Sequence, residues 1–281
     1  MNGKVCLVTG ATHGIGRVTA RRLAAAGATV LVHGRDAARA RAVAAEIAAR
    51  TGNAAVQAVL ADFANLAQVR RLAQELVARL PRLDVLINNA ARLGAARAPT
   101  ADGYEATFAV NHLAPFLLTN LLLGRLVQSA PARIIVVASE AHRRATLDFD
   151  DLMNARVGFI SAYERSKLAN LLFCRALAQR LAGSGVTVNA LHPGFVSSHL
   201  FHSSPTLLRL VLATAVRPFM RSVGRGAECS VYLATSAEVA GRSGGYYRDS
   251  ALLEPSPAAQ SDADAARLWS LSAQLTGLER A

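Results

Sequence analysis

The sequence predicts an α/β fold of the doubly wound class, in which helices cover both faces of one parallel sheet. Short apolar or β-branched segments alternate with longer helical segments from the start of the chain to its end, as in repeated βαβ units. Hydrophobic residues make up 52% of the 281 residues, enough for a substantial core. No linker rich in proline, glycine or serine and no internal repeat interrupts the alternation. We therefore expect residues 1–281 to form a single domain.

Seven short segments have the apolar and β-branched content of strands buried in a parallel sheet. These predicted strands are Lys4–Val8, Thr29–Val32, Ala55–Leu60, Leu83–Ile87, Arg133–Ala138, Val186–Leu191 and Gly245–Tyr247. The six segments between them are predicted helices, namely Ile15–Ala26, Asp36–Arg50, Leu66–Leu80, Tyr104–Gln128, Ala162–Leu181 and Arg225–Thr235. Since each helix joins two successive strands, about seven parallel strands are expected.

A glycine-rich turn joins the first strand to the first helix. Residues 9–16 read Thr-Gly-Ala-Thr-His-Gly-Ile-Gly, with glycines at positions 10, 14 and 16. Glycine removes the Cβ atoms that would block a tight turn and the approach of a pyrophosphate, and the helix N-terminus supplies free N–H donors. In this strand–turn–helix setting the pattern predicts a dinucleotide site, lined by Gly10, Thr12, His13, Gly14, Ile15 and Gly16.

The end of the second strand bears on the choice between NAD and NADP. Gly34 occupies the place where an acidic residue would bind the ribose 2′-hydroxyl of NAD, and Arg35 follows it. A guanidinium group there suits a 2′-phosphate, which favours NADP(H). The alternative is that Arg35 is a surface residue and Asp36 the ribose ligand, but Asp36 fits better as the N-cap of the next helix.

Tyr163 and Lys167 are four residues apart on a predicted helix, so they share one face of it. A nearby ammonium group favours the ionised phenol and lowers its pKa, which would make the tyrosine a usable proton donor and acceptor. Such a pair alone is more often two solvated surface residues. The motifs that precede it change this interpretation.

Taken together, the motifs resemble those of the short-chain dehydrogenases/reductases, in the single-domain branch with a Rossmann fold. They occur in order at fitting intervals and comprise Gly10 to Gly16, Asn88-Asn-Ala-Ala91, Asn111, Ser139, Tyr163-Glu-Arg-Ser-Lys167 and Pro193-Gly194. Further stretches resemble the retinol-dehydrogenase-like group, namely 110–119, 139–142, 166–170, 188–194 and 266–272.

The resemblance implies a catalytic tetrad of Asn111, Ser139, Tyr163 and Lys167. In the family, the tyrosine transfers a proton to or from the substrate oxygen, which the serine polarises. The lysine lowers the tyrosine pKa and holds the nicotinamide ribose, and the asparagine binds a water that links the lysine to solvent. The hydride chemistry belongs to the cofactor.

The resemblance also implies further cofactor contacts. Asp62 would accept from the adenine amino group, with Phe63 beside it, and Ser198 would meet the nicotinamide carboxamide. The other implied contacts are Asn88, Asn89, Ala90, Tyr163, Lys167, Pro193, Gly194 and Val196. Asn88 and Asn89 could equally stabilise a turn. Three positions depart from the family pattern, His13, Ala91 in place of glycine, and Ser198 in place of threonine.

Several other classes of function are disfavoured. The net charge of +12 is spread along alanine- and arginine-rich helices with only 5% aromatic residues, so no nucleic-acid partner is expected. No run of 18 apolar residues predicts a membrane span, and the N-terminus lacks the regions of a signal peptide. Cys6, Cys174 and Cys229 are typical of reduced cysteines in a cytoplasmic protein.

Two histidine-containing patterns point to other chemistry but are weak. His199 and His202 have no third ligand near them in the sequence, so no metal is expected. Ser139 lacks the Gly-x-Ser-x-Gly turn of a hydrolase nucleophile, and His142 is expected in a loop near the substrate entrance rather than as a base.

The segment 195–223 is expected to cover the substrate. It is dominated by leucine, valine, phenylalanine and methionine and contains no carboxylate. An apolar lid over the carboxyl ends of the strands would exclude water from hydride transfer and favour a hydrophobic aldehyde, ketone or alcohol. An ordinary amphipathic helix at Leu207–Met220, or a helix on a membrane surface, are the alternatives.

The expected function is that of an NADP(H)-dependent oxidoreductase that interconverts a carbonyl and an alcohol. An epimerase or dehydratase of the larger branch would need a C-terminal substrate domain, for which little sequence remains after Pro193. A catalytically idle dinucleotide sensor or scaffold is the alternative from another class. Helices 104–128 and 162–181 carry apolar residues on more than one face, for example Leu117, Leu121, Leu171, Leu172 and Leu177. The corresponding helices commonly pair between subunits in the family that the chain resembles, so we expect a homodimer or homotetramer, unless these faces are buried against the sheet.

Overall fold

The computed structural model describes residues 1–94, 99–196 and 221–278. Its centre is a sheet with the strand order β3-β2-β1-β4-β5-β6-β7-β8, in which only the β7–β8 pair is antiparallel. The strands are β1 (Val5–Val8), β2 (Thr29–Gly34), β3 (Val56–Leu60), β4 (Val85–Asn88), β5 (Ala132–Val137), β6 (Val186–His192), β7 (Tyr246–Arg248) and β8 (Ala251–Leu252). The doubly wound fold is confirmed, with eight strands instead of about seven. The two-residue strand β8 is too short to give a sequence pattern.

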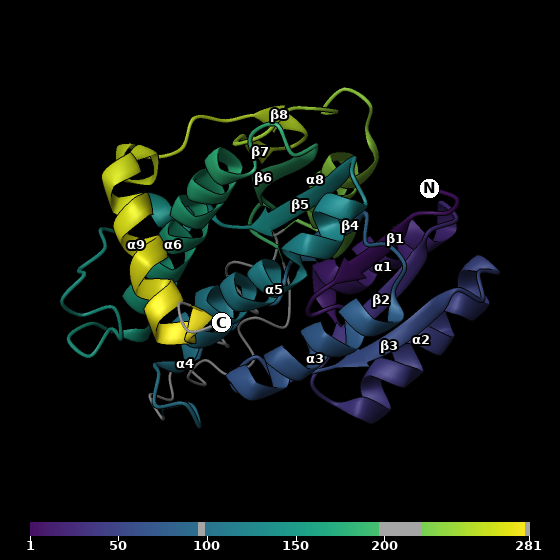
Figure 1. Cartoon of the computed structure of the whole chain (residues 1–281), viewed down its shortest axis with the longest axis horizontal. Helices are drawn as coiled ribbons and strands as arrows, with labels where there is room; N and C mark the ends of the chain where they lie inside the picture. Colours follow the sequence, from purple (N-terminus) through teal and green to yellow (C-terminus); the bar gives the residue numbers. More distant parts are fainter. Residues whose placement is uncertain (95–98, 197–220, 279–281) are drawn as a thin grey trace.

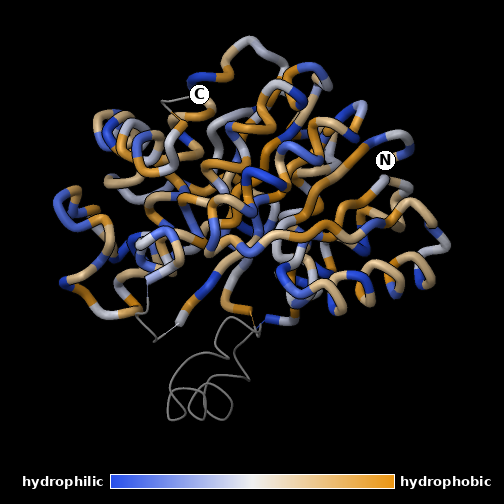
Figure 2. The backbone as a smooth tube through the Cα atoms, turned by 60° about the horizontal axis from the view of Figure 1, so that its bottom comes forward, coloured by the Kyte–Doolittle hydropathy of each residue, from blue (hydrophilic) through white to orange (hydrophobic). Residues whose placement is uncertain are grey.

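Helices cover both faces of the sheet (Figure 1). One face carries α1 (Gly14–Ala25), α2 (Ala37–Thr51) and α8 (Val223–Thr235). The other carries α3 (Leu66–Arg79), α5 (Ala114–Gln128) and α6 (Phe159–Arg180). Successive residues of a strand point to opposite faces, so Cys6 and Val8 of β1 pack with the first group and Val5 and Leu7 with the second. Figure 2 accordingly shows the hydrophobic residues concentrated in the interior.

The segment predicted as one helix at Tyr104–Gln128 is divided in three. It begins as α4 (Ala106–Phe108), continues as the π-helical turn η1 (Ala109–Leu113) and ends as α5. Within the described ranges, Ala106–Gln128 is the helical stretch long and apolar enough to cross a membrane, yet 78% of its apolar window is buried. The core helix of a folded domain has the same properties, so this stretch is weak evidence for a membrane span.

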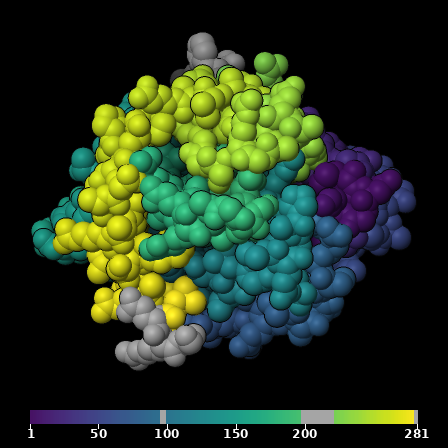
Figure 3. Space-filling model, turned by 45° about the horizontal axis from the view of Figure 1, so that its top comes forward, coloured from purple at the N-terminus to yellow at the C-terminus, as the bar shows by residue number. Residues whose placement is uncertain are grey.

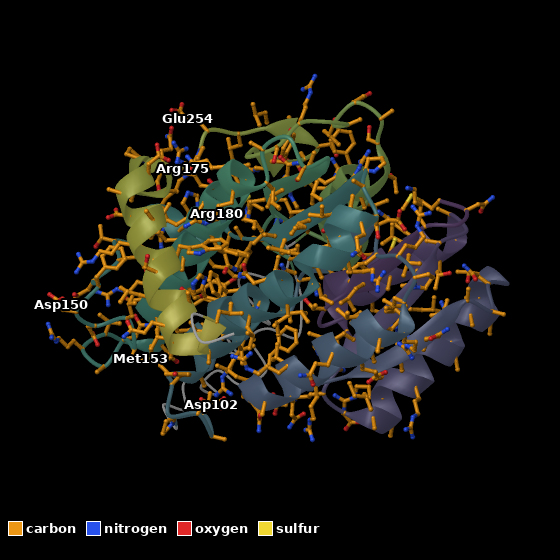
Figure 4. The ribbon with its side chains drawn as sticks, in the orientation of Figure 1. Asp102, Asp150, Met153, Arg175, Arg180 and Glu254 are labelled. Atoms are coloured by element: carbon orange, nitrogen blue, oxygen red, sulfur yellow. The ribbon has the colours of Figure 1, made fainter. Side chains whose placement is uncertain are left out.

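The C-terminal helix α9 (Asp262–Thr276) was not among the predicted helices. It begins at Ser261, whose hydroxyl accepts from the Asp264 N–H, and it lies along α6, as the yellow segment in Figure 3 shows from outside. Two arginines of α6, labelled in Figure 4, bind α9. Arg175 forms an ion pair with Asp262 at 2.6 Å, and the Arg180 guanidinium lies 4.2 Å from the centre of the Trp269 ring in a cation–π contact.

The chain itself covers the apolar faces that suggested an oligomer. The side chains of Leu117, Leu172 and Leu177 are fully buried, in the core that α5, α6 and α9 form with the sheet. These three residues therefore match the alternative of burial within one chain, whereas Leu121 is only partly buried and Val127 of α5 and Ile160 of α6 are exposed.

Candidate active site

A cavity of about 1180 Å³ runs along the edge of the sheet at which the parallel strands end. Its wall contains residues that directly follow β1, β2, β3, β4, β5 and β6, among them Gly10, Arg35, Ala61, Asn89, Ser139 and Pro193. Ligands of open α/β sheets bind outside the carboxyl ends of the strands, where the order of connection reverses. Here the reversal lies between β1 and β4, next to the glycine-rich turn.

The glycine-rich turn is packed so closely that side chains at its glycines would not fit. Gly10 has a φ of +62°, and a Cβ added there would lie 2.8 Å from the Cα of Ala90. A Cβ at Gly16 would lie 2.6 Å from the carbonyl oxygen of Gly10. Asn89 holds the turn from β4, since its Nδ2 donates to the Thr9 oxygen at 2.7 Å. The N-terminus of α1 thus opens into the cavity, with Thr12, His13, Gly14 and Ile15 also in its wall.

The end of β2 shows why no acid occupies the ribose position. A Cβ at Gly34 would lie 2.5 Å from the Thr12 methyl carbon. Arg35 is exposed, lines the cavity and has no ion pair within the described ranges. Asp36 caps α2, because its carboxylate accepts from the Arg39 N–H at 2.9 Å. Arg39 also reaches the cavity wall, so two arginines lie at this end.

A buried histidine links the glycine-rich turn to the adenine side of the cavity. The Nδ1 atom of His33 accepts from the Gly10 N–H at 3.1 Å, and its Nε2 lies 3.1 Å from the Ala61 oxygen. The ring stacks on Phe63 at 4.4 Å, and burial lowers the histidine pKa to about 4. Asp62 lies beside them in the wall, where its carboxylate accepts from the Ala64 N–H at 3.0 Å.

Ser139, Tyr163 and Lys167 converge on the cavity from β5 and α6. The Lys167 side chain is almost fully buried, its Nζ donates to the Val137 oxygen at 2.9 Å, and it lies 5.6 Å from the centre of the Tyr163 ring. Burial lowers the pKa of Lys167 to about 8 and raises the pKa of Tyr163 to about 12, against a hydrogen bond from Ser139 that lowers it. The expected depression of the Tyr163 pKa by Lys167 is therefore not seen in the protein alone, where loss of water around the phenol has the largest effect.

Two predicted site residues do not line the cavity. The Asn111 side chain is fully buried in the π-helical turn, and its amide bonds the Arg92 backbone and the Ser166 hydroxyl. Both donors of its amide nitrogen are therefore used within the protein, while its oxygen accepts one bond. Asn88 donates to the Thr119 hydroxyl at 2.9 Å and is also buried, which matches a structural role.

The residues after β6 close one end of the cavity. Pro193, Gly194 and Val196 line it, and Gly194 has a φ of +86°. Ala90 and Ala91 line it from β4, and Ala91 is not among the residues with positive φ, so alanine causes no strain there. Ser198, His199, His202 and the proposed helix at 207–220 lie outside the described residues. Among the residues that are described, no group of three or more histidine, cysteine or acidic side chains could hold a metal.

The family model for short chain dehydrogenases matches residues 4–206, which include all of this site. The chain belongs to the short-chain dehydrogenase family. As a member it is an oxidoreductase, and the resemblance seen in its motifs is confirmed.

Relatives of this dehydrogenase cover almost the whole chain. Human retinol dehydrogenase 14 is 43% identical over 295 residues, which cover 99% of this chain and 88% of the relative. A solved structure of an uncharacterized protein from Mycobacterium paratuberculosis shares 34% identity with a TM-score of 0.79, over 98% of this chain and 94% of that one. The complex of Pseudomonas aeruginosa RhlG with NADP shares 30% identity with a TM-score of 0.71, over 88% and 94%.

Sequence reasoning missed several wall residues of this short-chain dehydrogenase. His33, Arg39, Ala61, Ala138, Glu140 and His192 line the cavity but were not predicted to. Most lie at or just after the end of a predicted strand, and that position alone would have identified them. Arg39 is the exception, because it reaches the cavity from the first turn of α2. His142, expected near the substrate entrance, is instead buried and absent from the wall.

Proposed function

We propose that this chain is a single-domain, NADP(H)-dependent oxidoreductase that interconverts a hydrophobic aldehyde or ketone and its alcohol. The convergence of Ser139, Tyr163 and Lys167 on one cavity carries the proposal, because the same cavity is bounded by the glycine-rich turn and Arg35. The cofactor fits the residues present, since Gly10, Gly14 and Gly16 line the cavity at the N-terminus of α1, where free N–H groups suit a pyrophosphate.

Bound NADPH supplies the hydride that reduces the carbonyl carbon. The Ser139 hydroxyl hydrogen-bonds the carbonyl oxygen and polarises the bond. Tyr163 donates its proton to that oxygen as the alcohol forms and takes a proton back in the reverse direction. The transfer leaves a phenolate on Tyr163, which the buried ammonium of Lys167 stabilises. The attraction between these two charges is stronger in a buried site than in water, because the effective dielectric constant is lower there.

The preference for NADP(H) rests on the residues at the end of the cavity that would hold the adenosine of the cofactor. Arg35 and Arg39 offer guanidinium groups to a 2′-phosphate, and a Cβ at position 34 would lie 2.5 Å from the Thr12 methyl carbon. The complex of the relative RhlG contains NADP, which supports the same choice.

The hydrophobic substrate is supported by the lid sequence and the relatives. Segment 195–223 contains no acidic residue, and its first residue, Phe195, lines the cavity. Several relatives are named retinol dehydrogenases, and retinol is an apolar alcohol. Since burial contributes about 0.8 kcal/mol per CH₂ group, kcat/KM should rise along a series of straight-chain aldehydes, by about fourfold per carbon at first.

NADPH oxidation with a panel of aldehydes and ketones, retinaldehyde among them, tests the proposal. We expect turnover with long apolar members. A protein that binds NADPH yet reduces none of them would instead be the idle sensor, and a preference for small polar carbonyls would refute the substrate class alone.

We also propose a cytoplasmic location. The three cysteines are buried free thiols, as expected in a reducing compartment. Recovery of the native protein in the membrane fraction of lysed cells would contradict this location.

A further inference from the structure

The peptide bond that follows Ser139 is held between two imidazole rings. Its carbonyl oxygen, that of Ser139, lies 2.6 Å from the Nδ1 of His142. Its N–H, that of Glu140, donates to the Nδ1 of His192 at 3.3 Å. The carbonyl and the N–H belong to the same planar peptide unit. This unit is therefore held on one side by a residue of the 3₁₀ helix η2 (Glu140–Arg144) and on the other by the last residue of β6.

The partners of each ring define its tautomer. A carbonyl oxygen only accepts, so the Nδ1 of His142 carries the proton, and its Nε2 accepts from the Ser256 N–H at 3.1 Å. The Nδ1 of His192 accepts, so that ring carries its proton on Nε2. Both rings are therefore neutral, and burial supports this by lowering the pKa of His142 and by lowering that of His192 to about 4.

The clamped peptide controls the direction of the Ser139 hydroxyl. Ser139 is extended, with φ −163° and ψ 151°, and its ψ is defined by the plane of this peptide. The same hydroxyl accepts from the Ala141 N–H at 3.2 Å and bonds Tyr163. Rotation of the peptide would move Ser139 relative to both.

We propose that His142 and His192 are positioning residues that clamp the Ser139–Glu140 peptide and thereby hold the Ser139 hydroxyl against Tyr163. The proposal rests on the proposed reductase function. Through Ser256 the clamp also ties the catalytic serine to the segment after β8, next to Glu254 in Figure 4. His142 does not line the cavity, so it acts only through Ser139, whereas His192 also lies in the wall.

Three variants separate positioning from stability. His142→Leu removes both bonds of the ring. His142→Asn places an amide N–H where Nδ1 was and keeps the bond to the Ser139 oxygen. Tyr246→Phe is the matched control, because it keeps the buried ring that packs edge-on against His142 at 5.3 Å and removes only the hydroxyl, which donates to the Glu140 carboxylate at 2.8 Å. For each, kcat and KM for a carbonyl that the wild type reduces, the Kd for NADPH and the Tm are measured.

The His142→Leu variant should lose about 10- to 100-fold in kcat, the usual effect of a misplaced catalytic group, with KM and the NADPH Kd unchanged. His142→Asn should recover most of that loss, and Tyr246→Phe should lower Tm but keep kcat. The loss in the His142→Leu, His192→Leu double variant should be smaller than the product of the single losses, because both rings hold one peptide.

Unchanged kcat in His142→Leu would overturn the clamp, as would equal losses in His142→Leu and Tyr246→Phe or no recovery by asparagine. If the wild type reduces the carbonyl and Tyr163→Phe does not, these outcomes count against the clamp alone. A wild type without reductase activity overturns the proposed function, and the clamp with it.

Discussion

Burial decides the chemistry of single residues at this site. Lys167 is almost fully buried and its pKa falls to about 8, while that of Tyr163 rises to about 12. Loss of water thus shifts both groups toward their neutral forms. Their spacing of four residues was visible in the sequence, but the loss of water around them was not.

Tyr163→Phe tests the proton transfer. The change removes the hydroxyl and keeps the ring, so the fold and the NADPH affinity should be preserved. Turnover should fall at least about 100-fold, the lower end for general acid catalysis. Steady-state kinetics and NADPH fluorescence titration measure the two effects, and retention of most activity would mean that the proton comes from another group.

Arg35→Ala tests the choice of cofactor. Loss of a charge-assisted contact to the 2′-phosphate should weaken NADPH binding by about 1.5–3 kcal/mol and leave NADH binding almost unchanged. Arg41→Ala is the matched control, since Arg41 is an exposed arginine of α2 that does not line the cavity. Calorimetric Kd values that rise equally for the two cofactors would refute the role of Arg35.

At the scale of elements, one carboxylate joins the neighbouring strands β1 and β4. Asp84, just before β4, is almost fully buried and accepts from the Val5 N–H of β1 at 2.8 Å. It also bonds Lys4 at 2.9 Å and the Arg82 guanidinium. Although burial alone would raise the Asp84 pKa, the bonds from Arg82, Val5 and Lys4 together lower it.

Asp84→Asn should therefore destabilise the protein in a pH-dependent way. A lowered carboxyl pKa contributes stability above the unfolded value of about 4, and this is lost as the pH falls through the folded value. We expect a loss of roughly 1–3 kcal/mol at pH 7 by urea unfolding, which shrinks in acid. Glu75→Gln, which breaks an exposed pair with Arg79, should have little effect at either pH. A pH-independent loss would contradict the linkage.

At the scale of the whole molecule, α9 covers apolar side chains of α5 and α6 from within the same chain. It packs along α6 and contributes Trp269, which contacts Phe116 at 5.0 Å and Phe173 at 6.0 Å between ring centres. Burial of these side chains within one chain is the alternative to the homodimer or homotetramer that the resemblance implied, and this alternative predicts a monomer.

Sedimentation at micromolar concentration should show a monomer. Trp269→Ala should lower stability by about 3 kcal/mol, the lower end for loss of a large aromatic side chain from a core, and should promote association as the face of α6 becomes exposed. A wild-type dimer would show that another surface pairs, and an unchanged Tm in the variant would show that α9 contributes little.

The sequence by itself determined the strand–helix alternation, the glycine-rich turn and the Tyr163–Lys167 pair, because these depend on neighbours along the chain. It also indicated Asp36 as a helix cap, which the bond to Arg39 confirms. Only the tertiary structure decided the burial of Asn88 and Asn111, the elevated pKa of Tyr163, and the contacts of His33, His142 and His192. Each of these depends on groups far away in the sequence, such as Ser256 against His142, and no local pattern records which strand ends and loops the fold brings together.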